Sequence, residues 1–373
     1  MKTATATATA TTTATATATA AASASAAATT RAAGAARAAG AAGGVGASGV
    51  VCGSGVAGAR ARGGRLRRAL LASLVAAAVV VPVSAAASAE APAPAPAAFA
   101  EAAPPEERYA ANRDNLAEAV RMAQAAGRPG RAGRLRDMAA GGTAQFLAFD
   151  GRGRGRAVEV FGELETAERI AVLVPGSDTT LDTYERFRSG AIALQQRLQA
   201  GNPRSAVVAW LGYDTPGTVS TTVLTAGRAD EAAAELAPFL ERLRDMAAPG
   251  SRLSLLCHSY GSVVCARTRT GPAVGDMALY GSPGTGAGSV RELSTGARVW
   301  AGRGDADWIS GVPHVRLGGV GFGTDPVDPA FGARPFAAGG GGHSDYLKAG
   351  SGSLDALAAI VLGTAPSQGA SHA

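Results

Sequence analysis

The sequence predicts an α/β fold with a mostly parallel, doubly wound sheet, an N-terminal helix and a β-hairpin. Two patterns lead to this prediction. From residue 169 onward, short apolar runs alternate with amphipathic helical stretches, as strands and crossover helices do in such a sheet. One apolar run, residues 253–257, leads directly into His258-Ser259-Tyr260-Gly261 and a further helical stretch. Residues 106–365 are long enough for one domain of this class with a sizeable core.

The predicted elements follow in chain order. Helical spacing of apolar residues predicts a helix over residues 106–126 and a second over 131–139. A hairpin is expected from strands at 145–150 and 155–161, joined by a solvated Gly-Arg-Gly-Arg-Gly turn. Further strands are predicted at 169–174, 206–211, 253–257, 277–280, 298–301 and 334–337. Further helices are predicted at 184–199, 229–246, 262–269 and 354–362.

The N-terminal region predicts export. Residues 1–59 are a low-complexity Ala/Thr-rich leader that we expect to be disordered, and an alternative start codon near Val50 would remove most of it. Residues 60–89 contain several arginines, then an apolar run, and end in the sequence Ala87-Ser88-Ala89. This order is typical of a secretory signal peptide cleaved near Ala89. An uncleaved anchor is the alternative, and Arg67-Arg68 leaves Tat export open. We expect a secreted or cell-envelope protein with a Pro/Ala linker at 90–105 and a disordered tail at 366–373.

The basic charge of the chain lies in this leader. The sequence has 35 Lys and Arg against 29 Asp and Glu, and eight of the basic residues but none of the acidic ones lie within residues 1–89. The remainder has 27 basic and 29 acidic residues, so it predicts no nucleic-acid partner.

The pattern around Ser259 is typical of a nucleophile elbow, in which a serine sits on a strained strand-to-helix turn. Strand and helix nearly touch there, so the positions two before and two after the serine must be small. Gly261 satisfies this requirement, and Cys257 satisfies it in part. Cys257 and Cys265 flank the elbow, and we expect two free thiols because the helix should carry Cys265 too far away to bridge.

A serine nucleophile requires a histidine base. His343 follows the last predicted strand through a glycine-rich loop and is the preferred base, with His314 as the alternative. His258 adjoins the serine and is expected to pack beneath the elbow, and His372 lies in the tail.

The acid that orients the base should follow the penultimate strand. Asp305 and Asp307 both meet this condition, and spacing alone leaves them open. Asp325 and Asp328 lie in a Pro-rich loop, where turn roles are more common.

An oxyanion hole needs two backbone N–H donors. The Tyr260 amide supplies one, and the Ser177 amide after the Pro175-Gly176 turn supplies the other. Loops at 178–187, 211–224 and 282–293 are expected to shape the substrate pocket.

Several of these segments together resemble a known family. They are residues 172–184, 257–262, Asp307-Trp308-Ile309, 322–326 and 342–346. This set is similar to the actinobacterial α/β-hydrolase family of unknown function, DUF1023. The resemblance implies an α/β-hydrolase fold with Ser259 as nucleophile and His343 as base, and its Asp-Trp-Ile element favours Asp307 as the acid.

The sequence thus predicts an exported serine hydrolase, esterase- or lipase-like, that works through an acyl-enzyme without cofactor or metal. Its substrate is expected to be a small-molecule or lipid-like ester, less readily a thioester or amide, with transient contact to a membrane or cell envelope. Two alternatives remain: a catalytically silent binding protein of the cell envelope, and an acyltransferase.

Overall fold

A computed structural model describes residues 91–100, 102–140, 144–316 and 320–365. The predicted leader and signal peptide, the predicted tail and His372 lie outside the described residues. Residues 91–100 contain no helix or strand. None of the described helices combines the length and the apolarity that a bilayer span requires.

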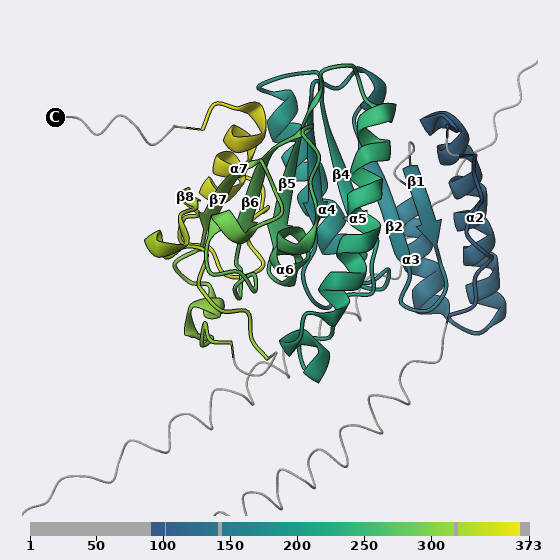
Figure 1. The fold of residues 1–373 in the computed structure, drawn as a ribbon. Helices are drawn as coiled ribbons and strands as arrows, with labels where there is room; N and C mark the ends of the chain where they lie inside the picture. The colour runs from purple at the N-terminus through teal and green to yellow at the C-terminus, as the bar shows by residue number, and fades with distance from the viewer. Residues whose placement is uncertain (1–90, 101, 141–143, 317–319, 366–373) are drawn as a thin grey trace, which may run out of the picture. The chain divides into compact units, whose positions relative to one another are not determined.

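The domain is built on one eight-stranded sheet, with strand order β1-β2-β4-β3-β5-β6-β7-β8 (Figure 1). Only β2 runs antiparallel to its neighbours, β1 and β4, and all later pairs are parallel. The predicted hairpin and the doubly wound sheet are therefore confirmed. The strands are β1 Gln145–Asp150, β2 Arg156–Phe161, β3 Arg169–Val174, β4 Ser205–Leu211, β5 Arg252–His258, β6 Val274–Tyr280, β7 Arg298–Gly302 and β8 Arg334–Pro335.

The helices agree with the predicted ones to within a few residues at each end. They are α2 Pro105–Ala125, α3 Pro129–Ala139, α4 Tyr184–Gln199, α5 Gly227–Met246, α6 Tyr260–Arg267 and α7 Gly352–Leu362. The largest differences in the strands are at β6, which begins at Val274 rather than residue 277, and at β8, which stops at Pro335 rather than residue 337. One further bond follows, from the Phe336 amide to the Ala301 carbonyl at 3.0 Å, and the regular pairing with β7 ends after it.

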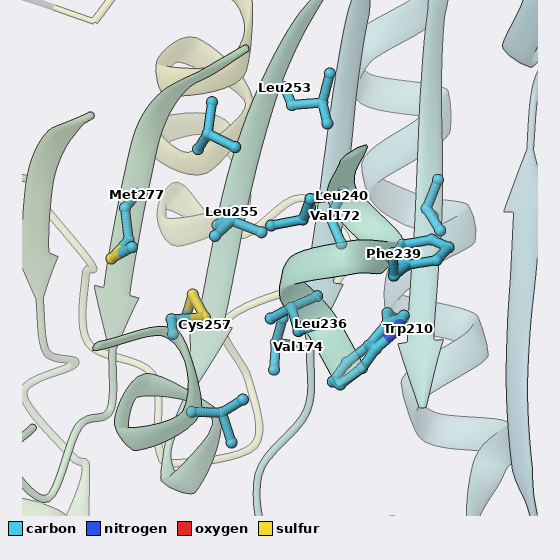
Figure 2. Close-up of a cluster of buried hydrophobic side chains, with 14 of the residues drawn as sticks. Val172, Val174, Trp210, Leu236, Phe239, Leu240, Leu253, Leu255, Cys257 and Met277 are labelled. Carbon is cyan, nitrogen blue, oxygen red and sulfur yellow. A yellow bond between two sulfur atoms is a disulfide. The ribbon is translucent and has the colours of Figure 1, made fainter. Parts of the chain in front are cut away.

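Side chains alternate between the two covered faces of the central strands. Along β3, Ala171 and Leu173 pack with α4 and α7, whereas Val172 and Val174 pack with α5 and α6. Figure 2 shows the second of these clusters, where Leu236 and Phe239 of α5 lie over the sheet. Because both faces are buried, these strands are apolar throughout, as parallel strands usually are.

Helices α2 and α3 cover the hairpin at the other end of the sheet. Leu116 of α2 and Leu135 of α3 are buried against Phe146 and Phe149 of β1. The buried Asn112 side chain also donates a hydrogen bond to the Phe146 carbonyl at 2.8 Å. Helices α2 and α3 thus extend the hydrophobic core to the hairpin edge of the sheet.

The prediction of two free thiols is wrong, because Cys257 and Cys265 form a disulfide (Figure 2). The Cys257 side chain points to the face of β5 that α6 covers. Helix α6 begins directly after the elbow and packs back on this face, so the two Cα atoms are only 6.4 Å apart. That separation lies within the range that disulfides span.

Breaking this disulfide is expected to destabilise the domain by about 2 kcal/mol, because the cross-link closes a short loop in the unfolded chain. The measurement is urea unfolding of the wild type with and without reductant. The double variant Cys257→Ala/Cys265→Ala is the control, since reductant should leave its unfolding midpoint unchanged. A wild-type midpoint that does not respond to reductant, in protein whose thiols are shown to be reduced, contradicts the prediction.

Candidate active site

Ser259 occupies a strained turn between β5 and α6. Its φ of 53° and ψ of −124° lie outside the regions that a residue with a side chain prefers. Hydrogen bonds fix this conformation from both sides: the Ser259 amide donates to the Tyr280 carbonyl of β6 at 3.0 Å. The Ser259 carbonyl accepts from the Ser262 amide at 2.9 Å and from the Ser262 hydroxyl at 2.6 Å. The predicted elbow geometry is therefore present.

Two glycines allow the backbones around the serine to approach closely. A Cβ atom at Gly261 would lie 2.4 Å from the Val174 carbonyl oxygen of β3. A Cβ atom at Gly176 would lie 2.6 Å from the Cβ of Ser259. Both distances are too short for any side chain, so the strand-to-helix turn and the loop after β3 require glycine at these positions.

His343 lies beside the serine. It follows β8 through the loop at residues 336–342, and its Nε2 atom is 2.9 Å from the Ser259 Oγ. Its side chain is only 13% exposed. The loop is held close to the end of β7, because the Gly339 carbonyl accepts a hydrogen bond from the Asp305 amide at 3.0 Å. A Cβ atom at Gly304 would lie 2.1 Å from the Gly341 carbonyl oxygen.

Asp307 is the acid that the structure places against this histidine. Its Oδ1 and Oδ2 atoms lie 2.8 and 3.0 Å from the His343 Nδ1. The buried carboxylate also accepts hydrogen bonds from the Ile309 amide at 2.9 Å and from the Tyr346 hydroxyl at 2.6 Å. Ser259, His343 and Asp307 therefore form one continuous hydrogen-bonded chain.

The charge state of Asp307 sets the direction of these hydrogen bonds. Burial alone would raise its pKa, but hydrogen bonds from His343, Tyr346 and the Ile309 amide outweigh burial and hold the pKa below its usual value. An ionised carboxylate can only accept, so the proton of the neutral imidazole lies on Nδ1. The Nε2 atom is then free to accept the proton of the Ser259 hydroxyl.

The other predicted acids and the alternative base do not join this chain. Asp305 is exposed, and its amide bonds the loop before His343. Asp325 pairs with Arg303, and Asp328 accepts from the Ala330 amide in its own turn. His314 lies 3.7 Å from Asp325. Asp307 is buried and Asp305 is exposed, and the spacing of the two residues in the sequence does not predict this difference.

His258 packs beneath the elbow. Its ring lies among those of Tyr280, His343 and Tyr346, with centroids 4.8 to 5.7 Å away. Its Nε2 atom is 2.8 Å from the His343 carbonyl oxygen, so the ring donates a hydrogen bond to the backbone of the neighbouring histidine. Burial, together with the His343 ring, lowers the pKa of His258 to about 3, and the ring is therefore neutral in the folded protein at ordinary pH.

The predicted oxyanion donors lie on either side of the serine. Tyr260 begins α6, and Ser177 follows Gly176 in the loop after β3. Among the described residues, neither of these two amides has an intramolecular hydrogen-bond acceptor. The loop of Ser177 is fixed by hydrogen bonds from the Tyr213 hydroxyl to the Pro175 carbonyl, 2.7 Å, and from the Asp178 amide to the Pro216 carbonyl, 3.0 Å.

The sequence predicted no direct contact with His343 or hydrogen bond to Asp307 for two residues that contact this site. The Tyr346 hydroxyl donates a hydrogen bond to Asp307 and accepts one from the Gly304 amide at 3.0 Å. It thereby joins the acid to the backbone just after β7. Trp308 lies with its ring 4.6 Å from that of His343. Both residues belong to motifs that carry the family resemblance, and the apolar pair Trp308-Ile309 after Asp307 was a further signal for burial of that acid.

Comparison with known proteins agrees with the topology. Residues 150–317 match the sequence profile of a family described as alpha/beta hydrolase. The domain has the α/β-hydrolase fold. The profile covers strands β2 to β7, the elbow and Asp307, and ends before His343.

Similar proteins include two from Mycobacterium tuberculosis strain H37Rv. The uncharacterized protein Rv2079 is 31% identical over 251 residues, which cover 58% of this chain and 38% of that protein. The uncharacterized protein Rv0963c is 33% identical over 186 residues, which cover 47% of this chain and 65% of that protein. The chain thus spans less than two thirds of the length of either relative.

Solved structures with a similar arrangement include esterase LipW from Mycobacterium marinum, with 14% identity and a TM-score of 0.37. The match covers 66% of this chain and 89% of that one. The α/β serine hydrolase XC6422 from Xanthomonas campestris, described as lacking a lid, has 16% identity and a TM-score of 0.34. That match covers 56% of this chain and 88% of the other.

The lowered pKa of His258 implies a particular dependence of stability on pH. The imidazole takes up a proton near pH 6.5 in the unfolded chain and near pH 3 in the folded one. The unfolded state therefore binds more protons across that window, and the free energy of unfolding decreases as the pH falls from about 6.5 to about 3.

His258→Gln removes this titration and keeps an N–H donor for the His343 carbonyl. In urea unfolding at several pH values, we expect the curve of the variant to be less steep in this window, by up to about 1.4 kcal/mol per pH unit. Parallel curves for the two proteins contradict the assignment of a neutral, buried His258.

Proposed function

We propose that this protein is a serine hydrolase, esterase- or lipase-like, that cleaves esters through an acyl-enzyme. The observation that carries the proposal is the hydrogen-bonded chain from the Ser259 hydroxyl through His343 to the buried Asp307. A strained elbow, an adjacent base and an acid that orients the base are the parts that nucleophilic catalysis by serine needs. The alpha/beta hydrolase profile that matches residues 150–317 supports the same class of activity.

In the proposed first half-reaction, the Ser259 Oγ attacks the carbonyl carbon of the ester while His343 Nε2 takes the hydroxyl proton. The negative oxygen of the tetrahedral intermediate lies between the Tyr260 and Ser177 amides. Collapse of the intermediate breaks the bond to the leaving alkoxide, which receives the proton from His343. An acyl-Ser259 ester and a free alcohol result.

In the second half-reaction, His343 takes a proton from water as the water attacks the acyl carbon. The same two amides hold the oxygen, and collapse returns the proton to Ser259 and releases the carboxylic acid. Asp307 keeps its charge throughout and stabilises the imidazolium that forms twice per cycle. Each of these steps uses side chains and backbone amides of this chain.

The proposal includes the cellular location and the family of the protein. We place it outside the cytoplasm, secreted or associated with the cell envelope, because residues 60–89 have the composition of a secretory signal. We further assign it to the actinobacterial α/β-hydrolases of the DUF1023 type, on the motifs around Ser259, Asp307 and His343.

Labelling with a fluorophosphonate tests whether Ser259 is activated. We expect one adduct per molecule on the peptide that contains Ser259, located by mass spectrometry, and no adduct in Ser259→Ala, because only a serine with an oriented base reacts readily. Protein denatured before labelling is the control for non-specific reaction. Folded wild-type protein that takes up no label contradicts the proposal and favours a silent binding protein. With an acceptor alcohol present, a predominance of transesterified product over acid would instead indicate an acyltransferase.

The two neighbouring aspartates offer a matched pair of variants. Asp307→Asn should lower kcat on a p-nitrophenyl ester by about 10⁴-fold, since the amide would favour the wrong imidazole tautomer. Asp305→Asn makes the same chemical change two residues away on an exposed side chain, and its rate should stay within about threefold of the wild type. Equal losses in the two variants contradict the role of Asp307.

A further inference from the structure

Large apolar side chains are exposed at only a few positions of the described chain, and these positions fall into two segments. One segment follows β4 and includes the short helical turn η2, Thr221–Leu224. The other follows β7 and includes η4, Trp308–Gly311. We call the exposed set the apolar rim: Val219, Leu224, Trp308, Val315 and Val320.

The two segments meet at the carboxyl edge of the sheet. The Gly321 amide, next to Val320, donates a hydrogen bond to the Leu224 carbonyl at 3.0 Å. Figure 1 shows both segments projecting from the edge where α6 begins. Leu224 and Val320 are therefore neighbours in space although they lie almost a hundred residues apart in the chain.

The rim borders the proposed catalytic residues. Trp308 is 55% exposed and its ring also contacts His343. The Thr225 carbonyl, next to Leu224, accepts a hydrogen bond from the Tyr260 hydroxyl at 2.7 Å. On the other side, the Thr218 amide donates to the Asp178 carboxylate at 3.1 Å, beside the loop of the Ser177 amide. A molecule that covers the rim therefore also covers the approach to Ser259.

The charges of the rim limit what can dock there. Residues 215–227 contain no charged side chain, and residues 308–316 contain no acid. Arg316 is exposed in the second segment, and its guanidinium donates to the Gly286 carbonyl at 3.0 Å. Apolar side chains together with an exposed cation fit the acyl chains and phosphate groups of a phospholipid layer.

We propose that the apolar rim docks the domain on a phospholipid surface, with Val219, Leu224 and Trp308 entering the layer. A protein partner seated on the rim would block the route to Ser259, whereas a lipid layer holds esters that can reach it. The docking itself does not depend on catalysis. The further consequence, that the substrate is a water-insoluble ester held in that layer, rests on the proposed function.

Tryptophan fluorescence reports on this docking at the rim itself. The chain has three tryptophans, and Trp210 and Trp300 are each only 2% exposed. With the full chain and phosphatidylcholine vesicles whose acyl chains are brominated, bromine in the layer should quench Trp308. Quenching that persists in Trp308→Phe, or no quenching at lipid concentrations where the protein sediments with the vesicles, overturns the proposal. No sedimentation with vesicles overturns it as well.

Single charges test which residues enter the layer. Val219→Asp and Leu224→Asp should each raise the lipid concentration for half-maximal quenching at least tenfold. Thr166→Asp adds the same charge at an exposed position before β3, on the opposite edge of the sheet, and should leave that concentration unchanged. Equal curves for all three variants overturn the proposal.

Ser259→Ala separates docking from catalysis. We expect its quenching curve to match that of the wild type, because the hydroxyl lies outside the rim. If Ser259 does not react with fluorophosphonate but quenching occurs as described, the proposed hydrolase function fails and the docking surface stands. If Ser259 reacts with fluorophosphonate and quenching is absent, the docking proposal fails and the proposed hydrolase function stands.

Discussion

The strained backbone of Ser259 is the constraint on which the rest of the site depends. A positive-φ conformation of this kind at a residue with a side chain persists only where its surroundings hold it in place. Here β6 binds the Ser259 amide, the first turn of α6 binds its carbonyl, and β3 lies so close that only glycine fits at position 261. The central strands therefore have to be fully assembled before the Ser259 hydroxyl reaches its position beside His343.

The periodicity of the sequence was enough to predict most of the elements. Residues 169–174 form a short continuous apolar run and residues 184–199 have helical spacing, and their predicted bounds match β3 and α4. The ends of helices and strands were harder to predict where tertiary contacts determine them. Helix α6 begins at Tyr260, two residues earlier than predicted, because the sharp turn at Ser259 lets the helix start at once.

Without the family resemblance, which favoured Asp307, neither the disulfide nor the choice of acid could be predicted from the pattern of the sequence, for a related reason. Whether Cys265 reaches Cys257 depends on the direction in which α6 leaves the elbow, and no local pattern encodes that direction. Asp305 and Asp307 are alike in spacing and differ in burial, which is set by the turn at Gly304 and by Tyr346 some forty residues later. Ser259 and His343 were easier to propose, since an elbow pattern and a glycine-rich loop after the last strand are local features.

The hydrogen bond from His258 to the His343 carbonyl also has a consequence for local opening. It joins the residue before Ser259 to the backbone of the loop that carries the imidazole, while Tyr346 joins that loop to Asp307. The loop after β8 belongs to no helix or long strand, and such segments usually open at low free energy. Here it has contacts to both β5 and the end of β7, so the loop can open and carry the imidazole away from Ser259 only when these hydrogen bonds break.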